Sequence, residues 1–363
     1  MHDMLSEGDN SGERSEKMSG DNSDTLVAVT GASGFIGLHC VLALLQDGYR
    51  VRGTLRDPTR QASLRQALEK HVEIGDRLEF QAAELMHDEG WAEAFADCRY
   101  VLHVASPIPR QLPRHEDELI APARDGTLRV LAAAKAAGVS RVVLTSSMAA
   151  VTNGHGHDDS YIYSEKDWSK INATLPPYPK SKTIAERAAW QYMESLAPEE
   201  AMELVAINPG MVYGPILEPD YGTSGEIVRK LMRRDLPRLP KLGWGSVDVR
   251  DVAGAHLQAM RVPAAAGQRF CCIAEPAWLA DVAQILKKNF AGRGYKVPTR
   301  TMPNFAVRLA ALIDKQVRLI LYELGHLPQI DNSRIKSVLD WQPRGLEEMV
   351  TAMGESMIEH KVV

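Results

Sequence analysis

The stretch Val29-Thr30-Gly31-Ala32-Ser33-Gly34-Phe35-Ile36-Gly37 decides the fold expected for this chain. It lies between a short β-branched run at residues 25–30 and a helical pattern at residues 35–46. In that setting Gly31 permits a tight turn, Gly34 lets the backbone approach a pyrophosphate at the helix N-terminus, and Gly37 lets the helix pack close to the sheet. The GxxGxxG spacing differs from the commoner GxGxxG, but its position between strand and helix predicts a dinucleotide-binding loop.

Strand and helix patterns alternate after this loop. Such alternation implies βαβ units and a parallel sheet. We therefore predict an α/β fold with a doubly wound, Rossmann-type parallel sheet and a smaller C-terminal substrate-binding lobe. The expected strands are residues 25–30, 50–55, 78–82, 100–105, 141–146 and 204–208, and the expected helices are 35–46, 59–72, 116–137 and 181–196.

The chain divides into three parts by composition and pattern. Residues 1–24 are rich in Ser, Gly, Asp, Glu and Asn, and they predict a disordered leader. Residues 25–212 form the expected nucleotide-binding core, and residues 213–363 a mixed lobe interleaved with the last core strands. In that lobe we expect an amphipathic helix at 305–324 and further helices at 281–289 and 344–359.

The bulk composition narrows the class of protein. The 363 residues carry a formal net charge of -5 and 45% hydrophobic residues, which gives no reason to expect nucleic-acid binding. No segment reads as a membrane span or a signal peptide. The four cysteines lack metal-ligand spacing, so we expect a reduced, cytoplasmic protein.

The end of the second strand indicates the cofactor. NAD sites carry an acidic residue there, whereas a cation suits the 2′-phosphate of NADP. Here Arg56 stands at the strand end, with Arg60 one turn later and Asp57 one place late for a ribose contact. We therefore favour NADPH over NADH, and leave open whether Arg60 belongs to the site or to a solvated helix face.

A tyrosine and a lysine four residues apart form the expected catalytic pair. In Tyr178-Pro179-Lys180-Ser181-Lys182 this spacing stacks both side chains on one helix face. An ammonium near a phenol should lower the phenol's pKa towards the working range. Ser147, after the strand at 141–146, lies at the carboxyl edge where it can polarise a carbonyl. We expect Ser147, Tyr178 and Lys182 to be catalytic.

The order of these motifs resembles the extended short-chain dehydrogenase/reductase family. The chain is most similar to the branch of dihydroflavonol reductases, cinnamoyl-CoA reductases and microbial aldehyde or ketone reductases. The resemblance covers nearly all of the chain after residue 25. It rests on the glycine loop and on His103-Val104-Ala105-Ser106-Pro107, Leu144-Thr145-Ser146-Ser147, the Tyr178 segment, Ile207-Asn208-Pro209-Gly210 and Asp248-Val249-Arg250-Asp251-Val252.

The resemblance implies a reductase of small carbonyl compounds, with the two long helices at 116–137 and 181–196 as a possible homodimer interface. Two plant substrate motifs are replaced here, by Thr152 with Asn153 and by Thr174-Leu175-Pro176-Pro177, which favours a microbial type of aldehyde or ketone reductase. The implied cofactor contacts are Gly31, Gly34, Phe35, Ile36, Gly37, Arg56, Glu84 in place of the family's Asp, Leu85, Val104, Ala105, Ser106, Tyr178, Lys182, Pro209, Gly210, Val212 and Ser224.

Other interpretations of the site residues and of the function remain open from the sequence. Candidate substrate contacts are Thr152, Asn153, His155 and Tyr213, although Tyr213 could equally be a core residue. The loop His155-Gly156-His157-Asp158-Asp159 has no second ligand cluster, so we expect no metal. A nucleotide-sugar epimerase or dehydratase, or a 3β-hydroxysteroid dehydrogenase-like enzyme, would keep the cofactor but change the reaction. A non-catalytic NADP-binding redox sensor would typically lack the Tyr and Lys that this chain retains.

Overall fold

The computed structural model describes residues 22–107, 115–156, 158, 160–198 and 202–363. The predicted leader lies outside this range except for residues 22–24. Among the described residues, no helix has both the length and the apolarity to cross a membrane.

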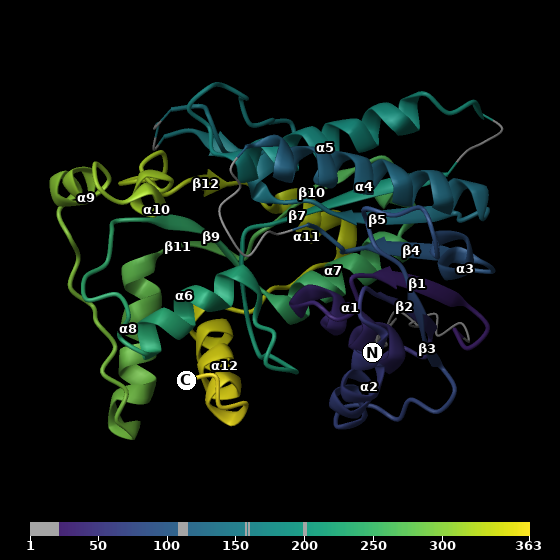
Figure 1. The fold of residues 1–363 in the computed structure, drawn as a ribbon, viewed down its shortest axis with the longest axis horizontal. Helices are drawn as coiled ribbons and strands as arrows, with labels where there is room; N and C mark the ends of the chain where they lie inside the picture. Colours follow the sequence, from purple (N-terminus) through teal and green to yellow (C-terminus); the bar gives the residue numbers. More distant parts are fainter. Residues whose placement is uncertain (1–21, 108–114, 157, 159, 199–201) are drawn as a thin grey trace, which may run out of the picture.

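A parallel sheet of seven strands forms the centre of the molecule, as predicted (Figure 1). The strand order is β10-β7-β5-β4-β1-β2-β3, so the winding direction reverses between β1 and β4. In doubly wound sheets, ligands bind outside the carboxyl ends of the strands at such a reversal. The strands are β1 (Leu26–Thr30), β2 (Arg50–Leu55), β3 (Leu78–Ala82), β4 (Tyr100–His103), β5 (Arg141–Thr145), β7 (Glu203–Pro209) and β10 (Arg269–Cys272).

Helices cover both faces of this sheet. Figure 1 shows α4 and α5 side by side on one face, with α1 and α7 on the other. The adjacent cysteines of β10 divide between the faces, since Cys272 belongs to the main core and Cys271 packs with Met148 and Tyr163. The helices of the core are α1 (Phe35–Gln46), α2 (Gln61–Glu69), α3 (Trp91–Phe95), α4 (Asp117–Ala136), α5 (Pro177–Glu194) and α7 (Val249–Arg261).

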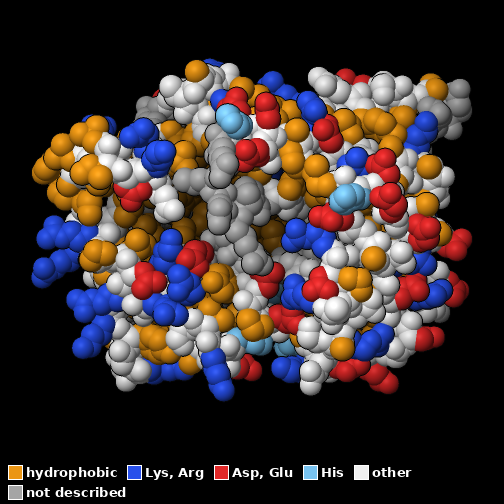
Figure 2. Space-filling model, viewed as in Figure 1, with side chains coloured by type: hydrophobic (Ala, Val, Ile, Leu, Met, Phe, Trp, Pro, Cys, Tyr) orange, Lys and Arg blue, Asp and Glu red, His pale blue; other side chains and the backbone are white. Residues whose placement is uncertain are grey.

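A smaller lobe lies beside the carboxyl edge of the sheet. Figure 2 shows a hollow between this lobe and the core, with hydrophobic side chains inside it. Because α7 and β10 come from the chain after Tyr213, lobe and core are interleaved. The lobe contains β8 (Met211–Tyr213), β9 (Gly243–Asp248), β11 (Glu275–Trp278), α6 (Gly222–Met232), α8 (Leu279–Phe290), α11 (Ser333–Leu339), α12 (Leu346–Glu359) and the pair β6 (Ile162–Tyr163) and β12 (Gln329–Ile330).

The prediction of a single helix over residues 305–324 is wrong. The structure has two short helices there, α9 (Asn304–Ala310) and α10 (Lys315–Arg318). Between them Asp314 is extended, and its carboxylate accepts from the backbone N–H of Gln316 at 2.7 Å. Such a cap competes with the continuing helix and starts a new one.

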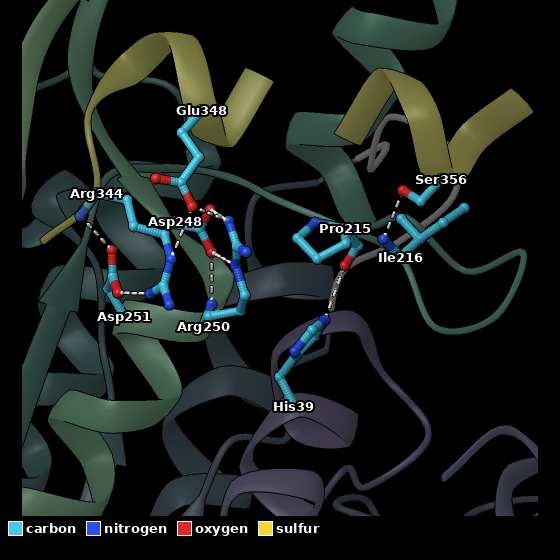
Figure 3. Close-up of polar contacts among 9 residues, drawn as sticks. All are labelled: His39, Pro215, Ile216, Asp248, Arg250, Asp251, Arg344, Glu348 and Ser356. Carbon is cyan, nitrogen blue, oxygen red and sulfur yellow. Dashed lines mark hydrogen bonds and ion pairs between the residues drawn. The ribbon is translucent and has the colours of Figure 1, made fainter. Parts of the chain in front are cut away.

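The segment Asp248-Val249-Arg250-Asp251-Val252 joins the lobe to the core (Figure 3). Asp248 caps α7 by accepting from the backbone N–H of Arg250 at 2.8 Å, and it also accepts from that residue's guanidinium. Arg250 reaches Glu348 of α12, and Asp251 pairs with Arg344. This motif is therefore a structural junction that connects α7 with the last helix.

A second link ties the lobe to the helix that follows the glycine loop (Figure 3). His39 Nε2 of α1 lies 2.8 Å from the carbonyl oxygen of Pro215, and the backbone N–H of Ile216 donates to Ser356 Oγ at 2.9 Å. Burial lowers the pKa of His39 to about 4, so the ring is neutral at physiological pH. The helix at the expected cofactor site is thus held from the lobe side.

Candidate active site

The glycine loop is shaped so that side chains would obstruct it. Gly31 has a φ of +66°, and a Cβ there would lie 2.8 Å from the Cα of Ala105. A Cβ on Gly37 would lie 2.2 Å from the carbonyl oxygen of Gly31. Gly34 precedes α1 without a side-chain cap, and the first turn carries no acidic residue. The N–H groups of Phe35 and Ile36 at this helix start are suited to an anionic pyrophosphate.

Thr30 fastens the loop to the neighbouring strand. Its hydroxyl accepts from the backbone N–H groups of Val104 and Ala105, each at 3.1 Å, and lies 2.8 Å from Nδ1 of His103. Burial lowers the pKa of His103 to about 3, so the neutral ring can accept the Thr30 proton. The predicted cofactor-lining segment Val104, Ala105 and Ser106 is therefore held against the loop.

Arg56 is exposed at the end of β2, as expected for a phosphate-binding side chain. It borders a shallow pocket together with Glu84 and His87, at the carboxyl ends of β2 and β3. Asp57, by contrast, accepts from the N–H and hydroxyl of Thr59, at 3.0 and 2.6 Å. Its carboxylate thus has a local capping role, and Arg56 is the charged side chain presented at the strand end.

Arg60 has a partner that the sequence did not reveal. It forms an ion pair with the buried Glu218 of the C-terminal lobe and reaches the carbonyl oxygen of Ser33 at 3.5 Å. The guanidinium therefore bridges the glycine loop and the lobe, rather than lying on a solvated helix face.

Ser147, Tyr178 and Lys182 meet at the carboxyl edge of the sheet. The helix α5 begins at Pro177, four residues earlier than predicted, and places Tyr178 in its first turn with Lys182 one turn on. The side chain of Ser147 lies close enough to the Tyr178 hydroxyl to affect its pKa. Lys182 Nζ donates to Ser106 Oγ at 3.1 Å, which connects the catalytic helix with the predicted cofactor-lining segment.

The pKa of Tyr178 is raised, which corrects the expectation that Lys182 lowers it. Desolvation by the surrounding protein is the largest cause, the hydrogen bond with Ser147 opposes it, and the charge of Glu323 adds to it. Burial also lowers the pKa of Lys182 to about 8, with Glu186 acting in the opposite direction. At neutral pH the Tyr178 phenol is therefore protonated, the state that a proton donor requires.

The buried carboxylate of Glu186 supports the site, and the sequence analysis did not identify it. Glu186, one turn after Lys182, accepts from Ser146 Oγ at 2.5 Å, Asn208 Nδ2 at 2.8 Å and Arg269 Nε at 2.5 Å. Asn208 also donates to the carbonyl oxygen of Ser147 at 3.2 Å. The network joins α5 to the ends of β5 and β7 and to the start of β10, and thereby holds the backbone of Ser147.

A second carboxylate approaches the site from the lobe. Glu323 follows α10, and its Oε2 accepts from Trp244 Nε1 of β9 at 2.9 Å. The Tyr322 side chain hydrogen bonds to the same carboxyl group. Burial raises the pKa of Glu323, while both hydrogen bonds act to lower it. No motif in the sequence marks this residue, because its relation to Tyr178 exists only after folding.

The four candidate substrate residues fall into two groups by position: Tyr213 lies in the main core, and the other three lie in the loop after Ser147. Tyr213 is 1% exposed and belongs to the main core, which was the alternative left open for it, and a substrate contact by Tyr213 stays a prediction. Thr152 Oγ1 donates to the carbonyl of Met148, and Asn153 Nδ2 to that of Ala149. His155 stacks near the rings of Tyr161 and Tyr163. These three shape the loop after Ser147, and a substrate contact by them stays a prediction.

Of the remaining cofactor candidates, residues 209–212 and Ser224 lie between the core and the lobe, whereas Leu85 lies in the core. Gly210 packs so closely that a Cβ would be 2.1 Å from the carbonyl oxygen of Gly245. Ser224 Oγ accepts from the backbone N–H of Val212 at 3.1 Å, which fixes α6 on β8. Leu85 packs beneath Gly126 of α4. These contacts place Pro209 to Val212 at the boundary, and their cofactor contacts stay predictions.

Within the described residues, no group of three His, Cys, Asp or Glu side chains is arranged to hold a metal ion. Two members of the loop considered above, His157 and Asp159, lie outside those residues.

Known proteins share both the sequence pattern and this geometry. Residues 27–271 match the model of the NAD dependent epimerase/dehydratase family. A cinnamoyl-CoA reductase of Medicago truncatula is 36% identical over 278 residues, which cover 75% of this chain and 83% of that protein. The NADPH-dependent methylglyoxal reductase GRE2 of Saccharomyces cerevisiae is 31% identical, covering 88% of this chain and 99% of that protein. This chain is therefore a member of the NAD dependent epimerase/dehydratase family.

A solved structure supports the same assignment. The yeast methylglyoxal/isovaleraldehyde reductase Gre2, complexed with NADPH, superimposes with a TM-score of 0.78 at 28% identity, covering 93% of this chain and 99% of the other. The chain is therefore an extended short-chain dehydrogenase/reductase of the reductase branch, and an oxidoreductase. Its glycine cradle, its uncapped α1 and its exposed Arg56 fit NADPH.

Proposed function

We propose that this protein reduces an aldehyde or ketone to the alcohol with NADPH, and that Tyr178 donates the proton. The observation that carries the proposal is that Ser147, Tyr178 and Lys182 come together at the carboxyl edge of the sheet, where Lys182 Nζ donates to Ser106 Oγ at 3.1 Å. The yeast relative named a methylglyoxal reductase and the plant relative named a cinnamoyl-CoA reductase both support a carbonyl substrate.

Each residue has a separate task in this proposal. NADPH, when bound, supplies the hydride. Ser147 donates a hydrogen bond to the carbonyl oxygen, which polarises the carbonyl and orients it beside Tyr178. The Tyr178 hydroxyl gives its proton to that oxygen as the alcohol forms. Lys182 keeps a positive charge near the resulting phenolate, and it binds the cofactor side of the site through Ser106.

Replacing Tyr178 with Phe tests the role of the hydroxyl directly. We expect kcat/KM for carbonyl reduction to fall by about 10²- to 10⁴-fold, the usual contribution of a positioned proton donor, while NADPH still binds. The matched control is Tyr192→Phe, on the same helix but outside the site. Loss of NADPH absorbance with an aldehyde panel is the measurement. Near-normal turnover by the Tyr178 variant would contradict the proposal.

We also propose a homodimer formed through α4 and α5, in a reducing cytoplasm. Ala132 and Ala136 lie exposed one turn apart on α4, where small side chains permit close helix approach. All four cysteines are buried and free, which suits a reducing compartment. Light scattering of the purified protein tests the dimer, and a monomer mass would contradict it.

A further inference from the structure

Glu323 is a buried carboxylate that no cation neutralises in the part of the chain described here. Its partners among the described residues, Trp244 and Tyr322, are neutral hydrogen-bond donors. No lysine, arginine or histidine among the described residues forms an ion pair with it. Burying a carboxylate without a counter-charge is costly, and a glutamine could accept the same two hydrogen bonds. The fold alone therefore gives little reason for an acid here.

The position of this carboxylate connects it with the reacting centre. Trp244 precedes Gly245, whose carbonyl oxygen packs against Gly210 at the predicted nicotinamide side of the site. Glu323 itself interacts electrostatically with Tyr178, and so does its neighbour Tyr322. Tyr178 is 40% exposed, so a substrate can reach its side chain. Glu323 thus belongs to the part of the lobe whose charge acts on Tyr178.

The chemistry of the group limits what it can bind. An ionised carboxylate accepts hydrogen bonds only, and it has about four lone-pair sites. Trp244 and Tyr322 occupy two of them and hold the carboxylate in place, which leaves capacity for a donor from the ligand. An anionic group at the same place would meet a like charge in a poorly hydrated environment, where repulsion is strong.

We propose that Glu323 is a substrate-binding residue, which accepts a hydrogen bond from a hydroxyl or similar donor beyond the reacting carbonyl and excludes substrates with an anionic group there. The proposal rests on the carbonyl reductase function proposed above and specifies its substrate class: hydroxylated, uncharged aldehydes or ketones.

Three aldehydes of one skeleton test this, each with substituents at the meta or para position: unsubstituted benzaldehyde, its hydroxymethyl derivative and its carboxylate derivative. Initial rates of NADPH consumption give kcat/KM for each. The variant is Glu323→Gln, which keeps the shape and an acceptor for Trp244. The matched control is Glu73→Gln, the same charge change on an exposed residue between α2 and β3, at the opposite edge of the sheet.

We expect wild-type enzyme and the Glu73 variant to prefer the hydroxymethyl over the carboxylate compound, in at least one ring position, by about 10- to 100-fold, the range for a charge-assisted hydrogen bond. The Glu323 variant should lose most of that preference while still reducing benzaldehyde. A mere packing role would lower all three rates together, which would overturn the proposal, as would an unchanged preference.

Two further measurements keep these outcomes distinct. If Glu323→Gln does not fold, as judged by circular dichroism, Trp244→Phe removes the donor that positions the carboxylate and should reduce the same preference. If wild-type enzyme binds NADPH but reduces none of the aldehydes or a wider ketone panel, the reductase function fails, and the specificity inference with it. Reduction of benzaldehyde with no preference between the two derivatives would overturn the specificity inference alone.

Discussion

At the scale of single residues, Arg56 is expected to set the preference for NADPH. It is exposed, and no carboxylate among the described residues forms an ion pair with it, so its guanidinium is available to a 2′-phosphate. Replacing Arg56 with Gln should lower kcat/KM for NADPH by about 10- to 100-fold, since a charged hydrogen bond contributes about 1.5–3 kcal/mol. The value for NADH should hardly change.

The control for this prediction is Arg50→Gln. Arg50 is also exposed and also on β2, but it begins the strand and therefore lies at the opposite sheet edge. Steady-state rates with both cofactors provide the measurement. An equal fall in kcat/KM with NADPH and with NADH would show that Arg56 does not recognise the 2′-phosphate.

The sequence could supply the identity of the reacting side chains but not their environment. Tyr178 and Lys182 could be found because their spacing places them on one helix face, whatever surrounds that helix. The direction of the Tyr178 pKa shift could not be found in this way. It depends on desolvation and on Glu323, a residue 145 positions later in the chain.

At the scale of elements, the junction of loop and helix should tolerate no side chain at Gly37. A Cβ there would collide with the carbonyl oxygen of Gly31, which is backbone and cannot turn aside. Gly37→Ala should therefore displace the glycine loop and weaken NADPH binding by at least about tenfold, equivalent to 1.4 kcal/mol. Fluorescence titration with NADPH measures this affinity.

Gly254 offers a matched comparison, because it is also a glycine inside a helix. A Cβ on Gly254 of α7 would meet nothing within 4 Å. Gly254→Ala should leave the NADPH affinity unchanged and raise stability by up to about 1 kcal/mol through helix propensity. Similar effects of the two substitutions would contradict the steric account of the loop.

Most core elements could be predicted from sequence because their patterns are local. The helix at 35–46 and the strands at 50–55 and 78–82 have the expected bounds. The elements of the lobe were harder to predict from sequence, as the two helices α9 and α10 show. Hydrophobic periodicity there indicated one helix, but the Asp314 cap interrupts it, and the pattern reflects packing of separate pieces around Leu242 and Leu324.

At the scale of the whole molecule, we expect stability to fall steeply with acid. Burial lowers the pKa of His39 to about 4, of His103 to about 3 and of His256 to about 4. In the unfolded chain these rings take up protons near pH 6.5, the ordinary pKa of a histidine side chain. The unfolded state therefore binds more protons than the native state as pH falls below 6.5, which costs up to about 3 kcal/mol each for His39 and His256 and up to about 5 kcal/mol for His103 by the time the native pKa is reached.

Urea unfolding at pH 7 and pH 5 measures this loss. His39→Gln can still donate to the carbonyl of Pro215 but cannot titrate, so its stability should depend less on pH than that of the wild type. His115→Gln, an exposed residue, serves as the control and should behave like the wild type. A pH dependence that the His39 substitution leaves unaltered would contradict the prediction.

The sequence by itself determined the parallel sheet and the glycine loop and indicated Ser147, Tyr178 and Lys182 as candidate catalytic residues, because these features depend on local spacing within elements and on the order of those elements along the chain. Only the tertiary structure decided that Arg60 pairs with Glu218, that Glu186 binds Ser146 and Asn208 beside Ser147 and that the charge of Glu323 acts on Tyr178. These partners lie on separate elements, and their effects arise from burial and from charges that meet only when lobe and core pack together.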